Sequence, residues 1–344
     1  RSFHVTGVQT CALPILAVLG GGSWGTVLAN LASINGNKVT LWMRDEANVE
    51  SINTNSLNTK YLPDYLLDRR LIATSNIEDI ESSLLVLFCV PSSSFREVLL
   101  KSIKHVNPEA LLISATKGIE EKGFLLMSQI LENEIKSHDI GVISGPNLAL
   151  EISQNQLTGT VIASKSKKLT EECIKIFASD SFRIYTNSDP YGVELGGALK
   201  NIYAIACGIA DGLQSGENTI GMIMTRGLAE MSRFAVNQGA DPMTFLGLSG
   251  VGDLITTCAS PLSRNHAFGK LIGKGFQVDE AQKEIGQTTE GLKTLKVVWN
   301  KSKEEGVDMP IVNSLYKIIY ENEPLEGSID RKSTRLNSSH VKRS

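Results

Sequence analysis

Short apolar runs alternate with amphipathic stretches through the first half of the chain, and both patterns predict regular structure. The runs are five to seven residues long and rich in Val, Ile and Leu, which is typical of fully buried strands. Eight candidate strands lie at 16–20, 38–43, 71–75, 84–90, 110–115, 140–144, 159–164 and 182–186. The stretches 26–34, 95–104 and 124–136 repeat apolar residues with a helical period. This alternation predicts a mostly parallel sheet with helices on both faces.

The pattern changes after about residue 187, and only helical periodicity continues from 191 to 321. Met222, Met224 and Met231 fall on one stripe of such a helix and are expected in the core. We therefore predict an α/β fold with two domains. A Rossmann-type doubly wound sheet occupies 16–189, and an all-α domain occupies 190–329.

The two ends of the chain are related to each other as nucleotide sequences. Codons can be chosen for 330–344 so that their reverse complement encodes 1–15, "RSFHVTGVQTCALPI", in frame at all 15 positions. We interpret 1–15 and 330–344 as translated adapter sequence and expect both to be disordered. The start also lacks the apolar core and small-residue cleavage site of a signal peptide.

Charge and cysteine content narrow the class of protein. Without the two ends, 28 Lys and Arg and 36 Asp and Glu remain, which changes the formal net charge from −3 to −8. This charge argues against nucleic acid or an anionic membrane as a partner. The four remaining cysteines show no metal-ligand spacing and predict reduced core thiols in a cytoplasmic protein. Neither a metal site nor a serine–histidine catalytic site is expected.

The stretch "VLGGGSWGT" predicts a dinucleotide site. Gly20, Gly22 and Gly25 have GxGxxG spacing between the first strand and the first helix, where backbone N–H groups can approach a pyrophosphate. Arg44 follows the second strand, where an arginine can pair with the 2′-phosphate of NADP(H). Asp45 comes next and could instead accept a ribose hydroxyl of NAD(H). We expect both cofactors to work, with NADP(H) preferred.

Several polar residues stand at positions suited to substrate chemistry. Lys117 in "SATKGIE" and Gly145 in "SGPNLALE" follow strands, at the sheet edge where ligands bind in doubly wound folds. Lys200 stands within the apolar helical stretch 193–212, where its burial costs free energy unless the lysine is used. Asp253 in "GLSGVGDLITTC" is either a helix N-cap or a partner for a lysine. On spacing alone, Lys117 is equally well explained as a solvated loop lysine.

"SPLSRNHAFG" provides an N-cap candidate, Ser263, followed by Arg264 and Asn265 in the first turn. An arginine at a helix N-terminus can bind phosphate bidentately, aided by the helix dipole. The alternative is a surface arginine that serves only the helix end. His266 is expected to be structural or to lie at the rim of the site.

Together these motifs resemble those of the bacterial type of NAD(P)-dependent glycerol-3-phosphate dehydrogenase over residues 16–325. The most specific are "LGGGSWGT", "NTNSLNTKYLP", "VELGGALKNIYAIACGIADGL", "GVGDLITTCASPLSRN" and "GQTTEGLKT". The resemblance implies reversible reduction of dihydroxyacetone phosphate to sn-glycerol 3-phosphate with NADPH or NADH, for phospholipid synthesis. It also implies a homodimer.

The resemblance assigns roles residue by residue. Lys200 matches the proton-transfer lysine, with Asp253 and Lys117 beside it in the catalytic group. The cofactor positions are Gly20, Gly22, Ser23, Trp24, Gly25, Arg44, Lys117, Ala149, Arg264, Thr288 and Glu290. The substrate positions are Lys117, Gly145, Asn147, Lys200, Asn201, Asp253, Ser263, Arg264 and Asn265.

Three features depart from the family pattern. Asn147 stands where Ser or Thr is usual, "NLALE" replaces a stretch that normally carries an aromatic residue, and Thr288 replaces an aliphatic residue at the cofactor rim. Two alternatives also remain at this stage. One is a related reductase of ketopantoate or 6-phosphogluconate type, and the other is a nucleotide-sensing module without activity. The combination of Lys200, Asp253 and "SRN" argues against both.

Overall fold

The structure is a computed structural model that describes residues 15–286 and 289–325. The predicted disorder of residues 1–14 and 330–344 and the predicted cofactor contact of Thr288 therefore lie outside the described residues. For Ile15, the last residue of the first predicted adapter segment, the predicted disorder is wrong: it is the first residue of strand β1 and pairs with Lys38.

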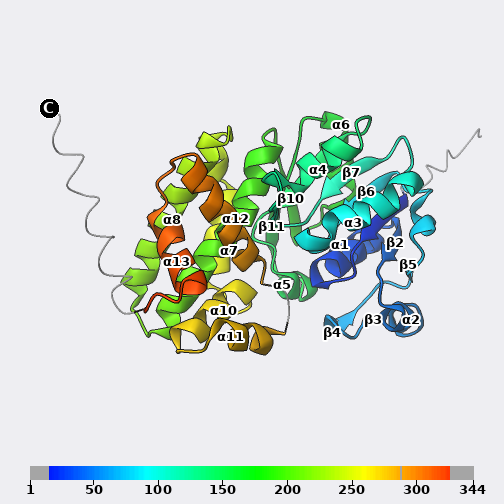
Figure 1. Cartoon of the computed structure of the whole chain (residues 1–344). Helices are drawn as coiled ribbons and strands as arrows, with labels where there is room; N and C mark the ends of the chain where they lie inside the picture. The colour runs from blue at the N-terminus through cyan, green and yellow to red at the C-terminus, as the bar shows by residue number, and fades with distance from the viewer. Residues whose placement is uncertain (1–14, 287–288, 326–344) are drawn as a thin grey trace, which may run out of the picture.

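The first domain is built on an eight-stranded sheet with the order β12-β11-β10-β7-β6-β1-β2-β5 (Figure 1). Six of these strands, β10, β7, β6, β1, β2 and β5, are parallel to one another, and β11 joins β10 in the antiparallel sense. The predicted mostly parallel sheet is thus confirmed. The strands are β1 Ile15–Leu19, β2 Lys38–Trp42, β5 Leu71–Thr74, β6 Leu85–Phe88, β7 Leu111–Ser114, β10 Ile140–Ser144, β11 Thr158–Ser164 and β12 Phe182–Asn187.

Helices cover both faces of this sheet, as the apolar runs predicted. Leu16 and Val18 of β1 belong to one hydrophobic cluster, and Ala17 and Leu19 belong to another on the opposite face. The helices of this domain are α1 Ser23–Ile34, α2 Glu46–Asn55, α3 Ser92–Ser102, α4 Met127–Glu134, α5 Ala149–Ser153 and α6 Lys167–Phe177.

Two segments differ from the predicted elements. The predicted helix at 124–136 begins only at Met127, because β9 (Leu125–Leu126) pairs with β8 (Ile119–Glu120). The segment 46–66, for which no element was predicted, forms α2 and a small hairpin of β3 (Leu57–Asn58) and β4 (Leu62–Leu66).

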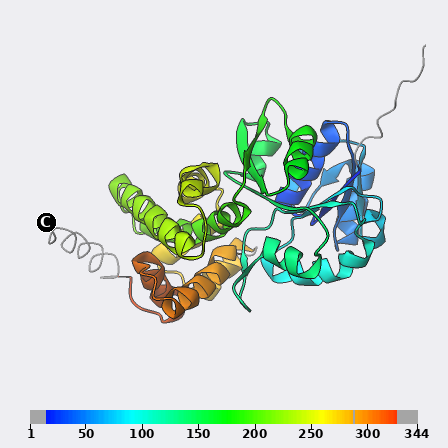
Figure 2. The ribbon, with the colours of Figure 1, turned by 90° about the horizontal axis from the view of Figure 1, so that it is seen from above.

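The second domain consists of helices among its described residues and lies beside the sheet domain in both views (Figures 1 and 2). Its first and longest helix, α7, is long and apolar enough to cross a membrane, but 94% of that window is buried inside the protein, as in a core helix. The helices are α7 Pro190–Gly212, α8 Glu217–Asn237, α9 Asp253–Ala259, α10 Arg264–Gly273, α11 Val278–Ile285, α12 Glu290–Glu304 and α13 Pro310–Tyr320.

The predicted methionine stripe on α8 is only partly correct. Met231 is fully buried and Met224 packs against the core of the helical domain, but Met222 is 42% exposed. Helix α8 buries a single narrow face near its C-terminal half, so its first two turns keep apolar side chains at the surface.

Helices α7 and α10 are in direct backbone contact. A Cβ atom added at Gly208 of α7 would lie 2.1 Å from the carbonyl oxygen of His266, and one added at Gly269 of α10 would lie 2.1 Å from that of Ile205. Gly212 and Gly273 repeat this arrangement one turn further along. No larger residue fits these positions without moving the helices apart.

Candidate active site

The glycine-rich turn has the geometry that a dinucleotide requires. Gly20 has φ +124°, and Gly25 approaches so closely that a Cβ there would lie 1.9 Å from the Gly20 carbonyl oxygen. A Cβ at Gly22, in contrast, would meet no atom within 4 Å. Two glycines therefore shape the turn, and the third leaves open space above it. The turn joins β1 to α1. In the sheet, β1 is the neighbour of β6, and at this pair of strands the strand order reverses.

The residues around this turn fit a nicotinamide cofactor. Helix α1 begins at Ser23 with no side-chain cap and no acidic residue in its first turn, so its N–H groups can bind a pyrophosphate. The indole nitrogen of Trp24 is buried without a hydrogen-bond partner among the described residues. Ala149 is half-buried and packs on the same hydrophobic cluster as Trp24. These positions are where the resemblance places the cofactor.

Arg44 and Asp45 occupy different environments at the end of β2. Arg44 is exposed. The Asp45 carboxylate caps α2 by accepting from the Asn48 N–H at 3.2 Å, and it pairs with Lys60 at 2.8 Å. Because Asp45 is already engaged at both oxygens, Arg44 is the better candidate for contact with the cofactor ribose.

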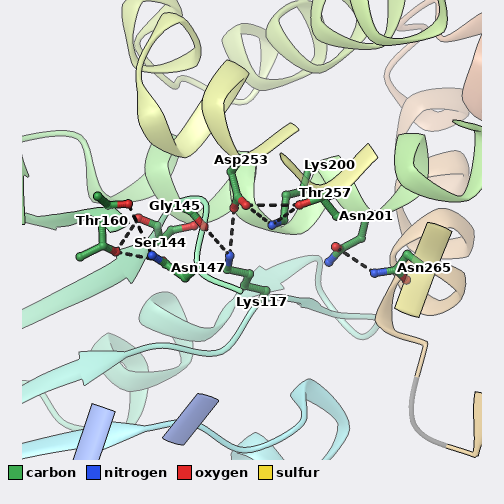
Figure 3. A network of polar contacts seen from close by, with 11 residues as sticks. Lys117, Ser144, Gly145, Asn147, Thr160, Lys200, Asn201, Asp253, Thr257 and Asn265 are labelled. Carbon is green, nitrogen blue, oxygen red and sulfur yellow. Dashed lines mark hydrogen bonds and ion pairs between the residues drawn. The ribbon is translucent and has the colours of Figure 1, made fainter. Parts of the chain in front are cut away.

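Three charged residues predicted in the catalytic group come together where the domains meet (Figure 3). The Asp253 carboxylate, 1% exposed, accepts from Lys200 through one oxygen and from Lys117, at 2.9 Å, through the other. Lys200 also donates to the Thr257 hydroxyl at 2.7 Å. Asp253 is the first residue of α9, so the lysine-partner alternative is confirmed and the N-cap alternative is wrong.

The environment of Lys200 favours loss of its proton. Its side chain is 6% exposed, and this burial lowers its pKa below the ordinary value of 10.5. Asp253 opposes the shift, whereas the ammonium of Lys117 adds to it. Two lysines share one carboxylate, so the group retains an excess positive charge when both are protonated. It therefore suits an anionic substrate and a developing negative charge.

The sheet domain supplies Lys117 and Gly145 to this group. Lys117 follows β7, and Gly145 follows β10. The Lys117 ammonium donates to the Gly145 carbonyl oxygen at 3.0 Å. Helix α7 packs tightly here, since a Cβ at Gly197 would lie 2.3 Å from the Ser144 hydroxyl oxygen. Lys117 is 20% exposed and paired with Asp253, so it is not a solvated loop lysine, and its predicted substrate contact stays a prediction.

Asn147 lies apart from the three charged residues, on the side of β11 (Figure 3). Its amide oxygen accepts from the Thr160 hydroxyl at 2.9 Å. Part of its hydrogen-bonding capacity is thereby used within the protein, and its predicted substrate contact stays a prediction.

The start of α10 has the predicted form. Ser263 is its N-cap and accepts from the His266 N–H at 3.2 Å, and Arg264 is exposed at the first helical position. Asn265 is buried and donates to the Asn201 amide oxygen at 3.0 Å. His266 is also buried, near Asp211, which agrees with a structural role.

Glu290 joins the helical domain to the sheet domain. From the first position of α12, its carboxylate accepts from the Ser92 hydroxyl at 2.6 Å and from the Ser92 N–H at 3.3 Å. Ser92 begins α3, and the segment between β6 and α3 touches the glycine-rich turn, since a Cβ at Gly20 would lie 2.6 Å from the Cys89 carbonyl oxygen. Glu290 therefore lies next to the predicted cofactor position.

Sequence reasoning missed Thr257 and Ser92. Thr257 lies four residues after Asp253, so a helix starting at Asp253 places both side chains on one face. That spacing could have identified it. Nothing local connects Ser92 with Glu290, which is 198 residues away.

Comparison with known proteins finds similar sequences over nearly the whole described chain. Sequence models of the N-terminus and the C-terminus of NAD-dependent glycerol-3-phosphate dehydrogenase match residues 15–170 and 189–330. The glycerol-3-phosphate dehydrogenase (NAD(P)+) of Saccharophagus degradans is 49% identical over 95% of this chain and 91% of its own length. That of Teredinibacter turnerae is 50% identical over 90% of this chain and 92% of its own.

Solved structures lead to the same family. Glycerol-3-phosphate dehydrogenase from Coxiella burnetii superposes with a TM-score of 0.89 at 35% identity, covering 92% of this chain and 98% of that one. A ketopantoate reductase from Ralstonia eutropha, with a TM-score of 0.57 at 15% identity over 89% of this chain and 97% of that one, shares the fold alone. The chain therefore belongs to the NAD-dependent glycerol-3-phosphate dehydrogenase family.

Proposed function

We propose that the chain reduces dihydroxyacetone phosphate to sn-glycerol 3-phosphate with NADPH or NADH, and catalyses the reverse reaction, for phospholipid synthesis. The observation that supports this most directly is the shared carboxylate of Asp253. It holds Lys117 from the sheet domain and Lys200 from the helical domain against each other where the domains meet.

Lys200 is the proton donor in this proposal. When bound, the cofactor supplies a hydride to the ketone carbon of the substrate. The carbonyl π electrons move to oxygen, and the Lys200 ammonium transfers a proton to that oxygen as the alcohol forms. Lys200 becomes a neutral amine and regains its proton from solvent. A lowered pKa makes the buried ammonium a better acid than an exposed lysine.

The neighbouring residues direct that transfer. Asp253 and Thr257 occupy two of the three donors of the Lys200 ammonium, which leaves the third for the substrate oxygen. Lys117 adds positive charge beside the developing oxyanion. Arg264 and the N-terminus of α10 bind the phosphate, with Ser263 fixing the helix end.

The reaction is tested by following NADPH absorbance after adding dihydroxyacetone phosphate. We expect rapid loss of absorbance, and at least about 10-fold slower loss with phosphate-free dihydroxyacetone, because the phosphate makes charged hydrogen bonds worth about 1.5–3 kcal/mol. No turnover of the phosphorylated ketone would refute the proposal. Equal rates for the two ketones would refute only the phosphate site.

Arg44 determines the preference between cofactors. Arg44→Ala is expected to weaken NADPH binding by about 1.5–3 kcal/mol and to leave NADH binding nearly unchanged, because only NADPH has a 2′-phosphate. Isothermal titration with each cofactor measures both affinities. Lys60→Ala is the matched control, because it removes a nearby exposed cation that pairs with Asp45. Equal losses for the two cofactors would show that Arg44 does not read the 2′-phosphate.

The proposal includes a homodimer in the cytoplasm. Large apolar side chains are exposed on the helical domain, and association would cover them: Leu213 is 41% exposed, Met222 42% and Ile255 49%. The four cysteines of the described residues are free thiols, which supports a reducing compartment.

A further inference from the structure

The small hairpin β3–β4 brings a buried asparagine to the glycine-rich turn. Asn58, the last residue of β3, is fully buried. Its amide nitrogen donates to the Gly21 carbonyl oxygen at 2.9 Å and to the Thr26 hydroxyl oxygen at 2.7 Å. Its amide oxygen accepts from the Asn48 amide at 2.8 Å and from the Tyr61 N–H at 3.3 Å. All four hydrogen-bonding positions of this amide are therefore used within the protein.

Backbone groups on both sides fix the orientation of the Asn58 amide. The Gly21 carbonyl can only accept a hydrogen bond and the Tyr61 N–H can only donate one, so the amide nitrogen must face Gly21 and the amide oxygen must face Tyr61. A reversed amide would place oxygen against oxygen on one side and N–H against N–H on the other. Asn58 therefore holds the Gly21 carbonyl in one direction.

The direction of the Gly21 carbonyl determines the direction of the next N–H. In a planar trans peptide the C=O and N–H bonds point to opposite sides, so the Gly22 N–H points away from Asn58. This N–H donates to no residue that the structure describes. Position 22 also borders open space, since a Cβ there would meet no atom within 4 Å. A pyrophosphate bound at the turn would occupy that space.

The peptide between Gly21 and Gly22 needs such a bond to keep one orientation. Neither residue has a Cβ, so rotation of this peptide is opposed by less steric hindrance than elsewhere in the chain. The Thr26 hydroxyl makes a second bond to the same carbonyl, but at 3.4 Å it is longer than the bond from Asn58. Asn58 therefore makes the shorter of the two bonds that fix this peptide.

The hairpin is bonded to the turn on both sides of Gly22. Before it, Asn58 binds the Gly21 carbonyl, and after it, the Ser23 hydroxyl donates to the Tyr61 carbonyl oxygen at 3.4 Å. Both bonds join the turn to a segment more than 35 residues further along the chain. The stretch "NTNSLNTKYLP" thus acquires a function at the cofactor end of the molecule.

We propose that Asn58 is a positioning residue for the cofactor: by holding the Gly21 carbonyl, it directs the Gly22 N–H toward the pyrophosphate. Asn58 itself touches neither cofactor nor substrate. The inference rests on the proposed function, which makes NADPH or NADH the ligand of this turn. Because both cofactors contain the same pyrophosphate, Asn58 serves them equally, whereas Arg44 acts on the 2′-phosphate of NADPH alone.

Asn58→Asp tests the proposal, because it keeps the side-chain shape and the two acceptor bonds but places an oxygen against the Gly21 carbonyl. The carbonyl is repelled, and the peptide turns its N–H away from the pyrophosphate. We expect the dissociation constants of NADPH and NADH, measured by isothermal titration, to rise equally, by about 10- to 100-fold, the scale of one hydrogen bond to a charged group. In steady-state kinetics, KM for either cofactor should rise similarly, while kcat should stay within about 3-fold.

Asn37→Asp is the matched control. Asn37 is also buried in the sheet domain, and its amide donates to the Ala32 carbonyl oxygen at 2.8 Å, near the other end of α1. The same substitution therefore breaks a similar bond away from the turn. Both variants should melt at a lower temperature, but Asn37→Asp should keep its cofactor affinity within about 3-fold. Asn58→Ser removes the donor without adding a charge and should reproduce the effect on both cofactors, so the test does not depend on the folding of one variant.

Three results would overturn the inference. The first is cofactor affinity within about 3-fold of the unmodified protein in both Asn58 variants. The second is a loss confined to NADPH, which would place the effect at the 2′-phosphate. The third is an equal loss in Asn37→Asp, which would make it a consequence of lower stability. The proposed reaction is judged separately, by cofactor binding and turnover of dihydroxyacetone phosphate in the unmodified protein.

Discussion

Replacing Lys200 with alanine is expected to lower turnover of dihydroxyacetone phosphate by about 10²-fold or more, which is the usual effect of losing a general acid. Affinity for NADPH should change little, because Lys200 belongs to α7 of the helical domain, whereas the glycine-rich turn belongs to the sheet domain. Steady-state kinetics and isothermal titration measure the two quantities. Near-normal turnover in the variant would show that another group supplies the proton.

The pH profile gives an independent check on this role. Burial and the Lys117 ammonium lower the pKa of Lys200, so its acidic form is lost at a lower pH than for an exposed lysine. The rate of ketone reduction should therefore fall as pH rises through this lowered pKa, well below 10.5, and the rate of alcohol oxidation should rise. Lys270→Ala removes an exposed lysine on α10 and should leave the pH dependence of both rates unchanged.

Replacing Asp253 with asparagine should damage both stability and activity. Asp253 is 1% exposed and binds two lysines, so its removal leaves two ammonium groups without their anion. Breaking a buried ion pair in this way costs about 3–5 kcal/mol. The opposing effect of Asp253 on Lys200 also disappears, so the pKa of Lys200 falls further and less of the acid form remains at pH 7.

Thermal unfolding and a pH–rate profile of the Asp253→Asn variant measure these effects. We expect a lower melting temperature and turnover reduced by at least about 10²-fold at pH 7, with part of the reduction rate returning at lower pH as Lys200 regains its proton. Asp211→Asn is the matched control, because it breaks an exposed pair with Lys270 that is worth less than about 1 kcal/mol. A variant as stable as the unmodified protein would contradict the buried arrangement.

The sheet was predictable because buried parallel strands leave an unbroken apolar run in the sequence. Each of the eight predicted strands is present, within two residues at either end. The insertion of α2 and the hairpin β3–β4 was not predicted, because α2 buries only Asn48 and Ile52 and so has no apolar stripe. The hairpin β8–β9 has two residues in each strand, too few for any alternation to appear.

The residues of the site were partly predictable, but their partners were not. Gly20 and Gly25 interrupt the pattern between a strand and a helix, and Lys200 is a charged residue in an apolar helical stretch. Such local exceptions to the pattern are typical of functional positions. Their chemistry could therefore be inferred from type and position. Which atoms meet depends on segments far apart in the chain, as with Lys117 and Asp253, 136 residues apart. The engagement of Asp45 with α2 and Lys60 was hidden for the same reason.

The contact between α7 and α10 sets a limit on the substrate. Lys200 and Asn201 lie on α7, and α10 begins with the proposed phosphate-binding Arg264, while the glycines of both helices place main chain directly against main chain. Side chains adjust by changing rotamer, but two touching backbones can only separate. In the proposed reaction, the contact between the two backbones thus fixes the distance between the group that protonates the ketone oxygen and the group that binds the phosphate. We therefore expect a substrate longer by one carbon to react poorly, because the distance between Lys200 and Arg264 is fixed by two packed backbones and not by any one side chain.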